Sequence, residues 1–238
     1  KLRPGVKIAL EGNGFSVNAY ILSVGLNGLR TVEVEDEEAL VKVGTVPLPP
    51  YIHQLLDDPE RYQTGYSREL GSAAAPTAGL HFTPNLLKAI NSKGVECVPV
   101  TLDVGVGTFR PVDSIELERH RMHTERYVVP ASTAAVINKA KSEGRRVWAV
   151  GTTVVRTLES AVSGGIVTSG FGETDLFIRP PQKCVMIDGL ITNFHLPKST
   201  LMMLVAAFCG YDTLVSAYAE AIQNNYRFYS YGDAMAIE

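Results

Sequence analysis

Two histidines stand where acid–base chemistry could be done. His81 follows the stretch APTAG at residues 75–79, whose small side chains let a ligand approach the backbone closely. His195 lies in the stretch NFHLPKS at residues 193–199. An imidazole can act as an acid, a base or a hydrogen-bond donor near neutral pH. A core or capping histidine would also suit each position, so the residue types alone leave both alternatives open.

A second set of residues could hold an anion or a nucleoside. The stretch GTTVVRTLES at residues 151–160 joins a predicted strand to a helix start, whose N–H groups suit a carboxylate or a phosphate. The same residues would also suit an ordinary helix with an ion pair between residues 156 and 159 and no ligand. At residues 193–199 an amide could bond a base or ribose, and a lysine could bond an anion. The candidate ligand-binding residues are Thr152, Thr153, Arg156, Glu159, Asn193, Lys198 and Ser199.

The charge distribution leaves room for one local nucleic-acid footprint. The net charge is −3, which argues against a broad, nonspecific nucleic-acid binder, yet residues 61–160 carry 13 basic and 9 acidic groups. Alternation predicts Arg119, Arg121 and His123 on one face of a strand, where they could contact phosphates. A solvated charged strand fits equally well. Arg110 could contact a ligand together with Asp103, or the two could form a structural pair.

Several classes of site have no support in the sequence. The three cysteines, Cys97, Cys184 and Cys209, are dispersed, and no HExxH or CxxC pattern occurs, so we expect neither a disulfide framework nor a metal site. GxSxG and GxxxxGK patterns are also absent. No apolar run reaches the roughly 18 residues of a membrane span. We therefore expect a cytoplasmic protein that does not enter the membrane.

The elements that must position these residues fall into two parts. Residues 1–46 show short apolar runs separated by Gly/Asn turns, which is typical of an antiparallel sheet or barrel. The stretch PLPP at residues 47–50 marks a boundary. Residues 47–238 alternate helices and strands, which predicts an α/β domain with partly parallel strands. Helices are expected near 84–94, 132–142, 152–162, 200–208 and 213–223, and strands near 95–104, 146–150, 174–178 and 185–194.

The same segments carry a family resemblance. The stretches APTAGLHFT (75–83), GVGTFRPV (105–112), GTTVVRTLES (151–160), DGLITNFHLPKSTL (188–201) and YRFYSYGDAM (226–235) resemble the S-adenosylmethionine:tRNA ribosyltransferase-isomerases. This resemblance implies a mixed-sheet α/β domain with an inserted small antiparallel β-barrel. Residues 1–46 would be the rear part of the barrel and residues 47–238 most of the α/β domain. Since the chain begins with Lys1, we expect that an N-terminal portion of the natural protein is missing.

The resemblance also implies a reaction and its partners. S-adenosylmethionine would be a co-substrate, with no permanently bound cofactor, and its ribosyl group would pass to 7-aminomethyl-7-deazaguanine at the wobble position of a tRNA. Epoxyqueuosine tRNA, adenine and methionine would be the products of a monomeric enzyme. His195 is the first choice for proton transfer and His81 the second, while the turn at 152–156 would hold the methionine carboxylate. Asn193 and Lys198 would orient ribose or phosphate.

The tRNA would be contacted by Arg110, Arg119, Arg121 and His123. Asp103 stands where the family commonly has histidine, and an ionised carboxylate cannot donate a hydrogen bond. Two other classes remain: an RNA-binding module without catalysis, and a small-molecule methyltransferase that uses the same co-substrate. A methyltransferase would favour a glycine-rich loop after the first strand of a doubly wound domain, and the sequence shows none.

Overall fold

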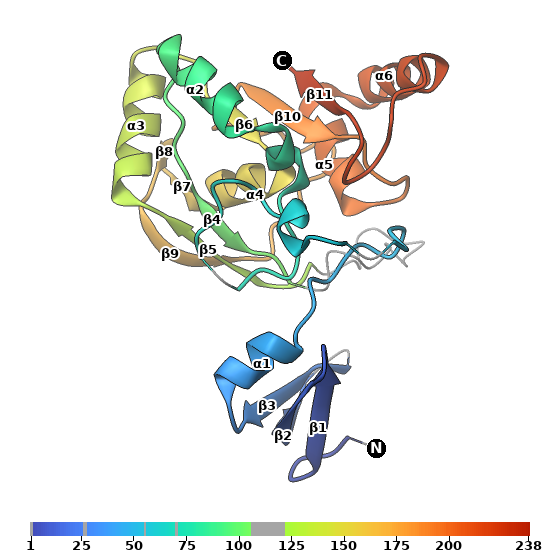
Figure 1. Cartoon of the computed structure of the whole chain (residues 1–238). Coiled ribbons are helices and arrows are strands. Elements are labelled where there is room, and N and C mark those ends of the chain that lie inside the picture. The colour runs from blue at the N-terminus through green and yellow to red at the C-terminus, as the bar shows by residue number, and fades with distance from the viewer. Residues whose placement is uncertain (1, 26–27, 55, 70, 106–121) are drawn as a thin grey trace. The chain divides into compact units, whose positions relative to one another are not determined.

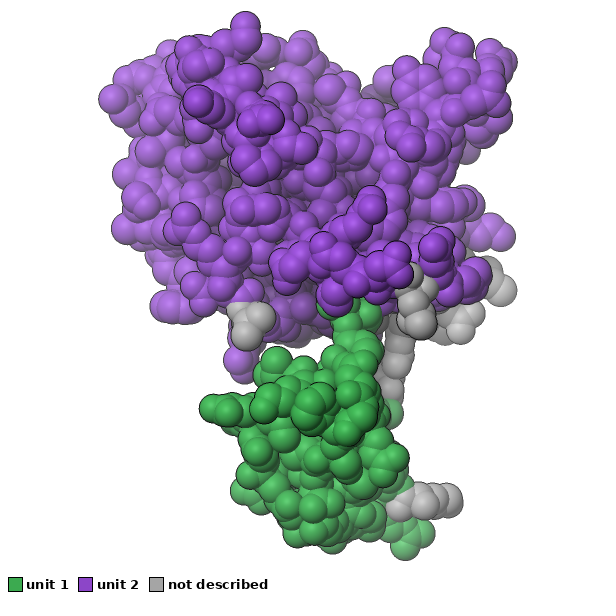
Figure 2. Space-filling view, in the orientation of Figure 1, with its two compact units in different colours: residues 1–47 green, residues 48–238 purple. Residues whose placement is uncertain are grey.

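The computed structural model describes all residues except 1, 26–27, 55, 70 and 106–121. The chain divides into two compact units, Lys1–Pro47 and Leu48–Glu238, which Figure 2 colours separately. Each unit has buried apolar side chains of its own.

The small unit is an antiparallel sheet with one helix. Its elements are β1 (Lys7–Gly12), β2 (Phe15–Val24), β3 (Arg30–Val34) and α1 (Glu37–Val43), with β2 in the centre of the sheet. Alternate residues of β2, namely Val17, Ala19 and Ile21, are buried, as expected for a sheet covered on one face. The sequence did not predict α1, although the side chain of Asp36 caps it by accepting a hydrogen bond from Ala39 N at 3.0 Å. The described strands form no closed barrel, so the inserted barrel stays a prediction.

The described residues of the large unit form strands in three separate sheets. The strands are β4 (Thr101–Asp103), β5 (Glu125–Val129), β6 (Trp148–Val150), β7 (Val162–Ser163), β8 (Ile166–Val167), β9 (Gly170–Thr174), β10 (Gly189–Asn193) and β11 (Ala234–Ile237). In the sheet β11-β10-β6, β10 is parallel to β6 and antiparallel to β11. The sheet β4-β5-β9 is antiparallel, and β7 pairs with β8. The large unit is therefore a mixed α/β structure.

One central helix, α4 (Thr152–Ala161), packs against both of the larger sheets (Figure 1). The helices are α2 (Pro84–Ser92), α3 (Ala131–Ser142), α4 (Thr152–Ala161), α5 (Thr200–Cys209) and α6 (Tyr211–Gln223), with 3₁₀ turns η2 (Pro59–Tyr62) and η3 (Thr77–His81). α4 packs against β6 on one side and against β4, β5 and β9 on the other. Its buried Val155 and Leu158 join a core with Ala149, Leu190 and Val205. Because α4 is fixed on several sides, its N-terminus has a well-defined place.

Two predicted strands differ from the observed ones. The strand expected over 95–104 is limited to Thr101–Asp103. The strand expected over 174–178 is wrong, since β9 covers Gly170–Thr174 instead. Gly172 of β9 lies against the ring of Tyr127 on β5, which leaves no room for a side chain. The glycine at position 172 is thus required by the neighbouring aromatic ring and is compatible with a strand.

Among the described residues, no single helix is long and apolar enough to cross a membrane. α5 and α6 meet the length and composition only when taken together, and they are bent by 113° where they join.

Candidate active site

The carboxyl ends of β6 and β10 bring three of the predicted segments together. These strands are parallel, so both end at the same edge of their sheet. Directly after β6, Gly151 N donates a hydrogen bond to Ile191 O at 2.8 Å. η3 packs beside β10, and a Cβ built on Gly151 would lie 3.9 Å from Ala78 of η3. The turn at Gly151, the end of β10 and the segment that carries His81 therefore share one edge.

The N-terminus of α4 lies at this edge. Gly151 is the N-cap residue, at φ +93°, and among the described residues no side chain caps the helix there. A positive φ of this kind favours glycine, and the uncapped N–H groups carry the positive end of the helix dipole. Thr152 is buried and Thr153 half-buried directly behind them. This turn suits a carboxylate or a phosphate.

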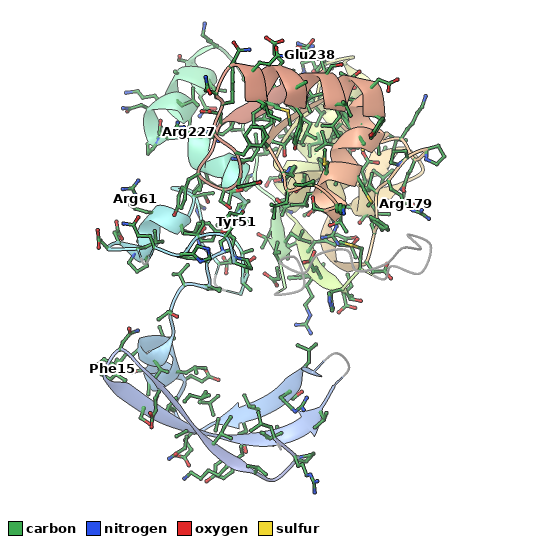
Figure 3. All side chains as sticks on the ribbon, turned by 90° about the vertical axis from the view of Figure 1, so that its right-hand side faces the viewer. Phe15, Tyr51, Arg61, Arg179, Arg227 and Glu238 are labelled. Carbon is green, nitrogen blue, oxygen red and sulfur yellow. The ribbon has the colours of Figure 1, made fainter. Side chains whose placement is uncertain are left out.

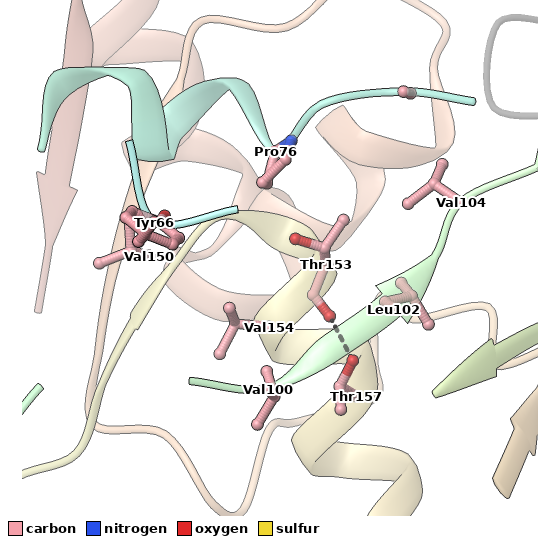
Figure 4. A pocket seen from close by; sticks show the side chains of 10 residues that line it. Tyr66, Pro76, Val100, Leu102, Val104, Val150, Thr153, Val154 and Thr157 are labelled. Carbon is pink, nitrogen blue, oxygen red and sulfur yellow. Dashed lines mark hydrogen bonds between the residues drawn. The ribbon is translucent and has the colours of Figure 1, made fainter. Parts of the chain in front are cut away.

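A small apolar pocket lies along the first two turns of α4 (Figure 4). Its volume is about 70 Å³. The Thr157 Oγ1 hydroxyl donates to Thr153 O at 2.9 Å, so this polar group on the wall is already satisfied. A 150 Å³ cavity takes one benzene ring, so about half that volume holds an aliphatic group and excludes a purine. The lining residues are Tyr66, Ala74, Pro76, Val100, Leu102, Val104, Val150, Thr153, Val154 and Thr157.

Asn193, at the end of β10, connects η3 to the C-terminal segment. Its side chain is buried, and its Nδ2 donates to Tyr229 O at 3.1 Å. Nδ2 also lies 3.4 Å from His81 Nε2, while Thr77 Oγ1 donates to Asn193 Oδ1 at 3.5 Å. His81 itself is exposed at the surface of this edge. Asn193, which is buried, thus contacts the exposed His81 ring and helps to fix its position.

His195 belongs to a different environment. Its Nε2 lies 2.7 Å from Thr192 Oγ1, and its backbone N donates to Tyr218 Oη at 2.7 Å. Burial lowers the pKa of His195 to about 4, so the ring is neutral at physiological pH. Thr192 and Asn193 are adjacent on a strand and point to opposite faces. The two histidines therefore contact side chains that lie on opposite faces of β10.

Arg156 and Glu159 are bonded within the fold, and not to each other as their spacing suggested. Arg156, 6% exposed, donates through Nη1 to Glu125 Oε2 and through Nε to Leu176 O at 3.2 Å. Glu159 accepts hydrogen bonds from Val185 N at 3.0 Å and Met186 N at 2.9 Å. These partners come from β5 and from the loops that follow β9. Both side chains therefore hold α4 in place.

Ser199 and Lys198 lie at the start of α5. Ser199 is the N-cap of α5: its Oγ accepts from Met202 N at 3.2 Å and donates to Leu196 O at 2.7 Å. Lys198 is exposed, with φ +57°. The Ser199 hydroxyl is thus occupied by the helix, and Lys198 is the more accessible of the two.

The predicted tRNA contacts are described only in part. Arg110, Arg119 and Arg121 lie outside the described residues. His123 is half-buried and precedes β5, which begins at Glu125, so the expectation of a strand at His123 is wrong. Asp103 ends β4 and pairs in register with residue 126. Within the described ranges, no three His, Cys, Asp or Glu side chains gather as a metal site would need.

Sequence reasoning missed residues that hold the site together. Thr77 and Tyr229 lie in the motifs APTAGLHFT and YRFYSYGDAM, but nothing in their spacing showed that both bond to Asn193. Tyr66 lies with its hydroxyl against Gly79 of η3 and lines the pocket, and burial raises the pKa of Tyr66. The one available signal was Gly79 itself, because a glycine inside a short turn often marks a close approach.

Comparisons with known proteins agree on one family. A family model described as queuosine biosynthesis protein matches residues 1–237. The S-adenosylmethionine:tRNA ribosyltransferase-isomerase of Natranaerobius thermophilus is 51% identical over 247 residues, covering 100% of this chain and 72% of that protein. The protein of the same name from Synechococcus elongatus is 58% identical over 198 residues, covering 83% of this chain and 55% of that protein. The crystal structure of S-adenosylmethionine tRNA ribosyltransferase from Thermotoga maritima matches with a TM-score of 0.57 at 34% identity, covering 100% of this chain and 67% of that one.

Proposed function

The chain belongs to the queuosine biosynthesis protein family of S-adenosylmethionine:tRNA ribosyltransferase-isomerases, and from that membership we propose its reaction. The protein transfers and isomerises the ribosyl group of S-adenosylmethionine onto 7-aminomethyl-7-deazaguanine at the tRNA wobble position. The products are epoxyqueuosine tRNA, adenine and methionine. The positive sulfonium acidifies the adjacent C5′ proton, so a base can form an ylide that leads to loss of adenine. The substrate amine then attacks, and closure of the epoxide releases methionine.

The observation that carries this proposal is the shared edge at the ends of β6 and β10. An uncapped helix N-terminus, an apolar pocket and an exposed histidine lie together there. The N–H groups at Thr152 and Thr153 suit the methionine carboxylate. The pocket beside them has the right size for the neutral aliphatic chain of the methionine part of the co-substrate, and it is too small for adenine. Adenine and ribose would then lie outside the pocket, next to Asn193 and Lys198.

Of the two histidines, His81 is the better candidate for contact with the reacting nucleoside. It is exposed at the shared edge and held by Asn193. His195 has its Nε2 bonded to Thr192 and a pKa lowered to about 4, which makes it a weak base and a better structural residue. We therefore assign His81 the catalytic role and His195 a supporting one.

The test is an incubation with adenine-labelled S-adenosylmethionine and precursor tRNA. Release of free adenine, with label-free tRNA gaining the ribosyl group, is the expected result, and the relative from Natranaerobius thermophilus serves as the positive control. S-adenosylhomocysteine as product would instead make the protein a methyltransferase. Binding of tRNA without either product would make it an RNA-binding module, and both results overturn the proposal.

Matched variants separate the histidines. His81→Ala should abolish adenine release and leave S-adenosylmethionine affinity within a few fold. His195→Ala should mainly lower the thermal stability of the protein. If His195→Ala is stable and has no activity while His81→Ala reacts like the wild type, the assignment is reversed.

The tRNA contact is proposed for Arg110 and for the basic stretch at residues 119–126, which includes Arg119, Arg121 and His123. Replacing Arg119 and Arg121 with Ala should weaken tRNA binding and reduce the salt slope by about 0.7–0.9 for each phosphate that the variant no longer neutralises. Lys139→Ala, an exposed charge on α3, is the matched control. An unchanged slope in the double variant would show that the segment is only solvated.

The remaining assignments also belong to this proposal. The small unit would be part of a β-barrel inserted into the α/β domain. The enzyme would act as a monomer in the cytoplasm, with S-adenosylmethionine as a co-substrate and no resident cofactor.

A further inference from the structure

We propose that Asn193 is a positioning residue that holds His81 as a neutral imidazole with its proton on Nδ1. His81 would then act in the reaction as a hydrogen-bond donor through Nδ1–H, and not as the base. This inference rests on the proposed function for its chemical consequence, but the tautomer itself is a property of the free protein. The two parts can therefore be tested separately.

The orientation of the Asn193 amide follows from its neighbours. Tyr229 O is a backbone carbonyl, which can only accept, so the amide atom 3.1 Å from it must be Nδ2. The Oδ1 atom then faces Thr77 Oγ1, which donates to it at 3.5 Å. The reverse orientation would place two acceptors, Oδ1 and Tyr229 O, at hydrogen-bond distance. Because Asn193 is only 2% exposed, water cannot replace either partner.

The amide orientation decides the protonation of His81. The Nδ2 group has two hydrogens: one is used by Tyr229 O and the other points at His81 Nε2, 3.4 Å away. A donor at this place requires an acceptor, so Nε2 holds a lone pair and Nδ1 carries the proton. Protonating Nε2 would set two donors against each other.

One charged group of the C-terminal segment acts on His81. Asp233 interacts electrostatically with it. Its carboxylate, however, accepts a hydrogen bond from Arg227 N at 2.7 Å and lies 3.4 Å from the Arg227 guanidinium. These contacts with Arg227 are the main cause that holds the pKa of Asp233 below its usual range. Asp233 thus interacts more strongly with Arg227 than with His81.

A neutral imidazole with Nδ1–H suits a leaving group that gains negative charge. The glycosidic bond breaks with its electron pair going to adenine, and a fixed N–H donor stabilises that charge as it develops. No proton leaves His81 in this step, and the departing adenine anion takes its proton from water. The base for the C5′ proton must therefore be another group.

The first experiment reads the tautomer in the chain without substrates. Long-range ¹H–¹⁵N NMR spectra distinguish a protonated from an unprotonated ring nitrogen, and His81→Gln assigns the signal among the five histidines. At pH 7.5 we expect the proton on Nδ1 in the wild type and in the control Asn91→Asp, an exposed site on α2. Asn193→Asp places an acceptor next to Nε2 and should move the proton there. A wild-type proton on Nε2, or no change in Asn193→Asp, overturns the positioning role.

The second experiment reads adenine release. An amide N–H can replace an imidazole N–H donor, but it cannot replace a base. We expect His81→Gln to retain at least tenfold more kcat than His81→Ala, and Asn193→Asp to lose kcat in parallel with the shift of the proton to Nε2. Equal loss in His81→Gln and His81→Ala overturns the donor role. Absence of adenine release in the wild type overturns the proposed function, while the NMR result still decides the tautomer.

Discussion

Replacing Arg156 with Met tests whether this residue stabilises the fold or binds a ligand. Arg156 and Glu125 are 6% and 4% exposed, and Arg156 also donates to Leu176 O at 3.2 Å. Glu125 Oε1 in turn accepts from Gly105 N at 3.1 Å. Removing one partner of a buried ion pair costs about 3–5 kcal/mol, because the other charge stays in a low-dielectric interior. We expect Arg156→Met to lower the free energy of unfolding by that amount.

Urea denaturation measures the loss directly, and in a thermal scan it corresponds to roughly 6–20 °C for a protein of this size. The matched control is Arg126→Met on β5, the strand that also carries Glu125. There the ion pair with Glu173 spans 3.7 Å, and the side chains are 80% and 64% exposed. That exposed pair should be worth about 0–1 kcal/mol. If Arg156→Met unfolds like the control and loses affinity for S-adenosylmethionine, then Arg156 is a ligand contact and the reasoning from burial is refuted.

Three further substitutions test neighbouring parts of the site. Glu159→Gln weakens the acceptor for the N–H groups of residues 185–186 and should cost about 1–3 kcal/mol in urea with S-adenosylmethionine affinity unchanged; a loss of affinity alone would contradict this. The pKa of His195 lies at about 4, below its ordinary 6.5, so the unfolded chain binds the extra proton and stability falls between pH 6.5 and pH 4. His195→Gln should remove on the order of 3 kcal/mol of that decline, measured by urea unfolding at pH 7 and pH 4, and an equal decline in both proteins would count against it. Gly79→Ala sets a methyl group against the Tyr66 hydroxyl and against Thr64 Cγ2, and it should cost about 1–3 kcal/mol and much of the activity. Adding Tyr66→Phe should restore part of both, and no rescue would mean that this contact is not the cause.

Local signals in the sequence were sufficient for the elements whose stability is local. Thr83-Pro84 begins α2 as predicted, with Thr83 Oγ1 accepting from Leu86 N at 3.2 Å. The alternation in residues 16–24 corresponds to β2, whose buried residues repeat every second position. β9 could not be found in this way, because its Gly172 is explained only by the Tyr127 ring of another strand.

The candidate site was predictable as a place and less so as a set of contacts. The motifs around Gly151, Asn193 and His81 lie in segments that meet at one edge of the sheet, where two parallel strands end (Figure 1). The partners of each side chain were not readable, since Arg156 bonds to Glu125 across 31 positions and not to the residue three places along its helix. The C-terminal segment shows the same limit: Tyr51 bonds to Ser230 at 2.8 Å, and Figure 3 labels Tyr51 and Arg227 on the same side of the large unit.

The alternation of β10 is what divides the work of the two histidines. Both were candidates because they stand near small or polar residues, and His195 was the first choice for proton transfer. A strand, however, turns neighbouring side chains to opposite faces, so Thr192 fixes His195 on one face and Asn193 fixes His81 on the other. His81 is therefore exposed to a ligand, while His195 is desolvated and loses basicity. Because the two rings have no shared partner in these contacts, their effects on stability should add in the double variant His81→Gln/His195→Gln.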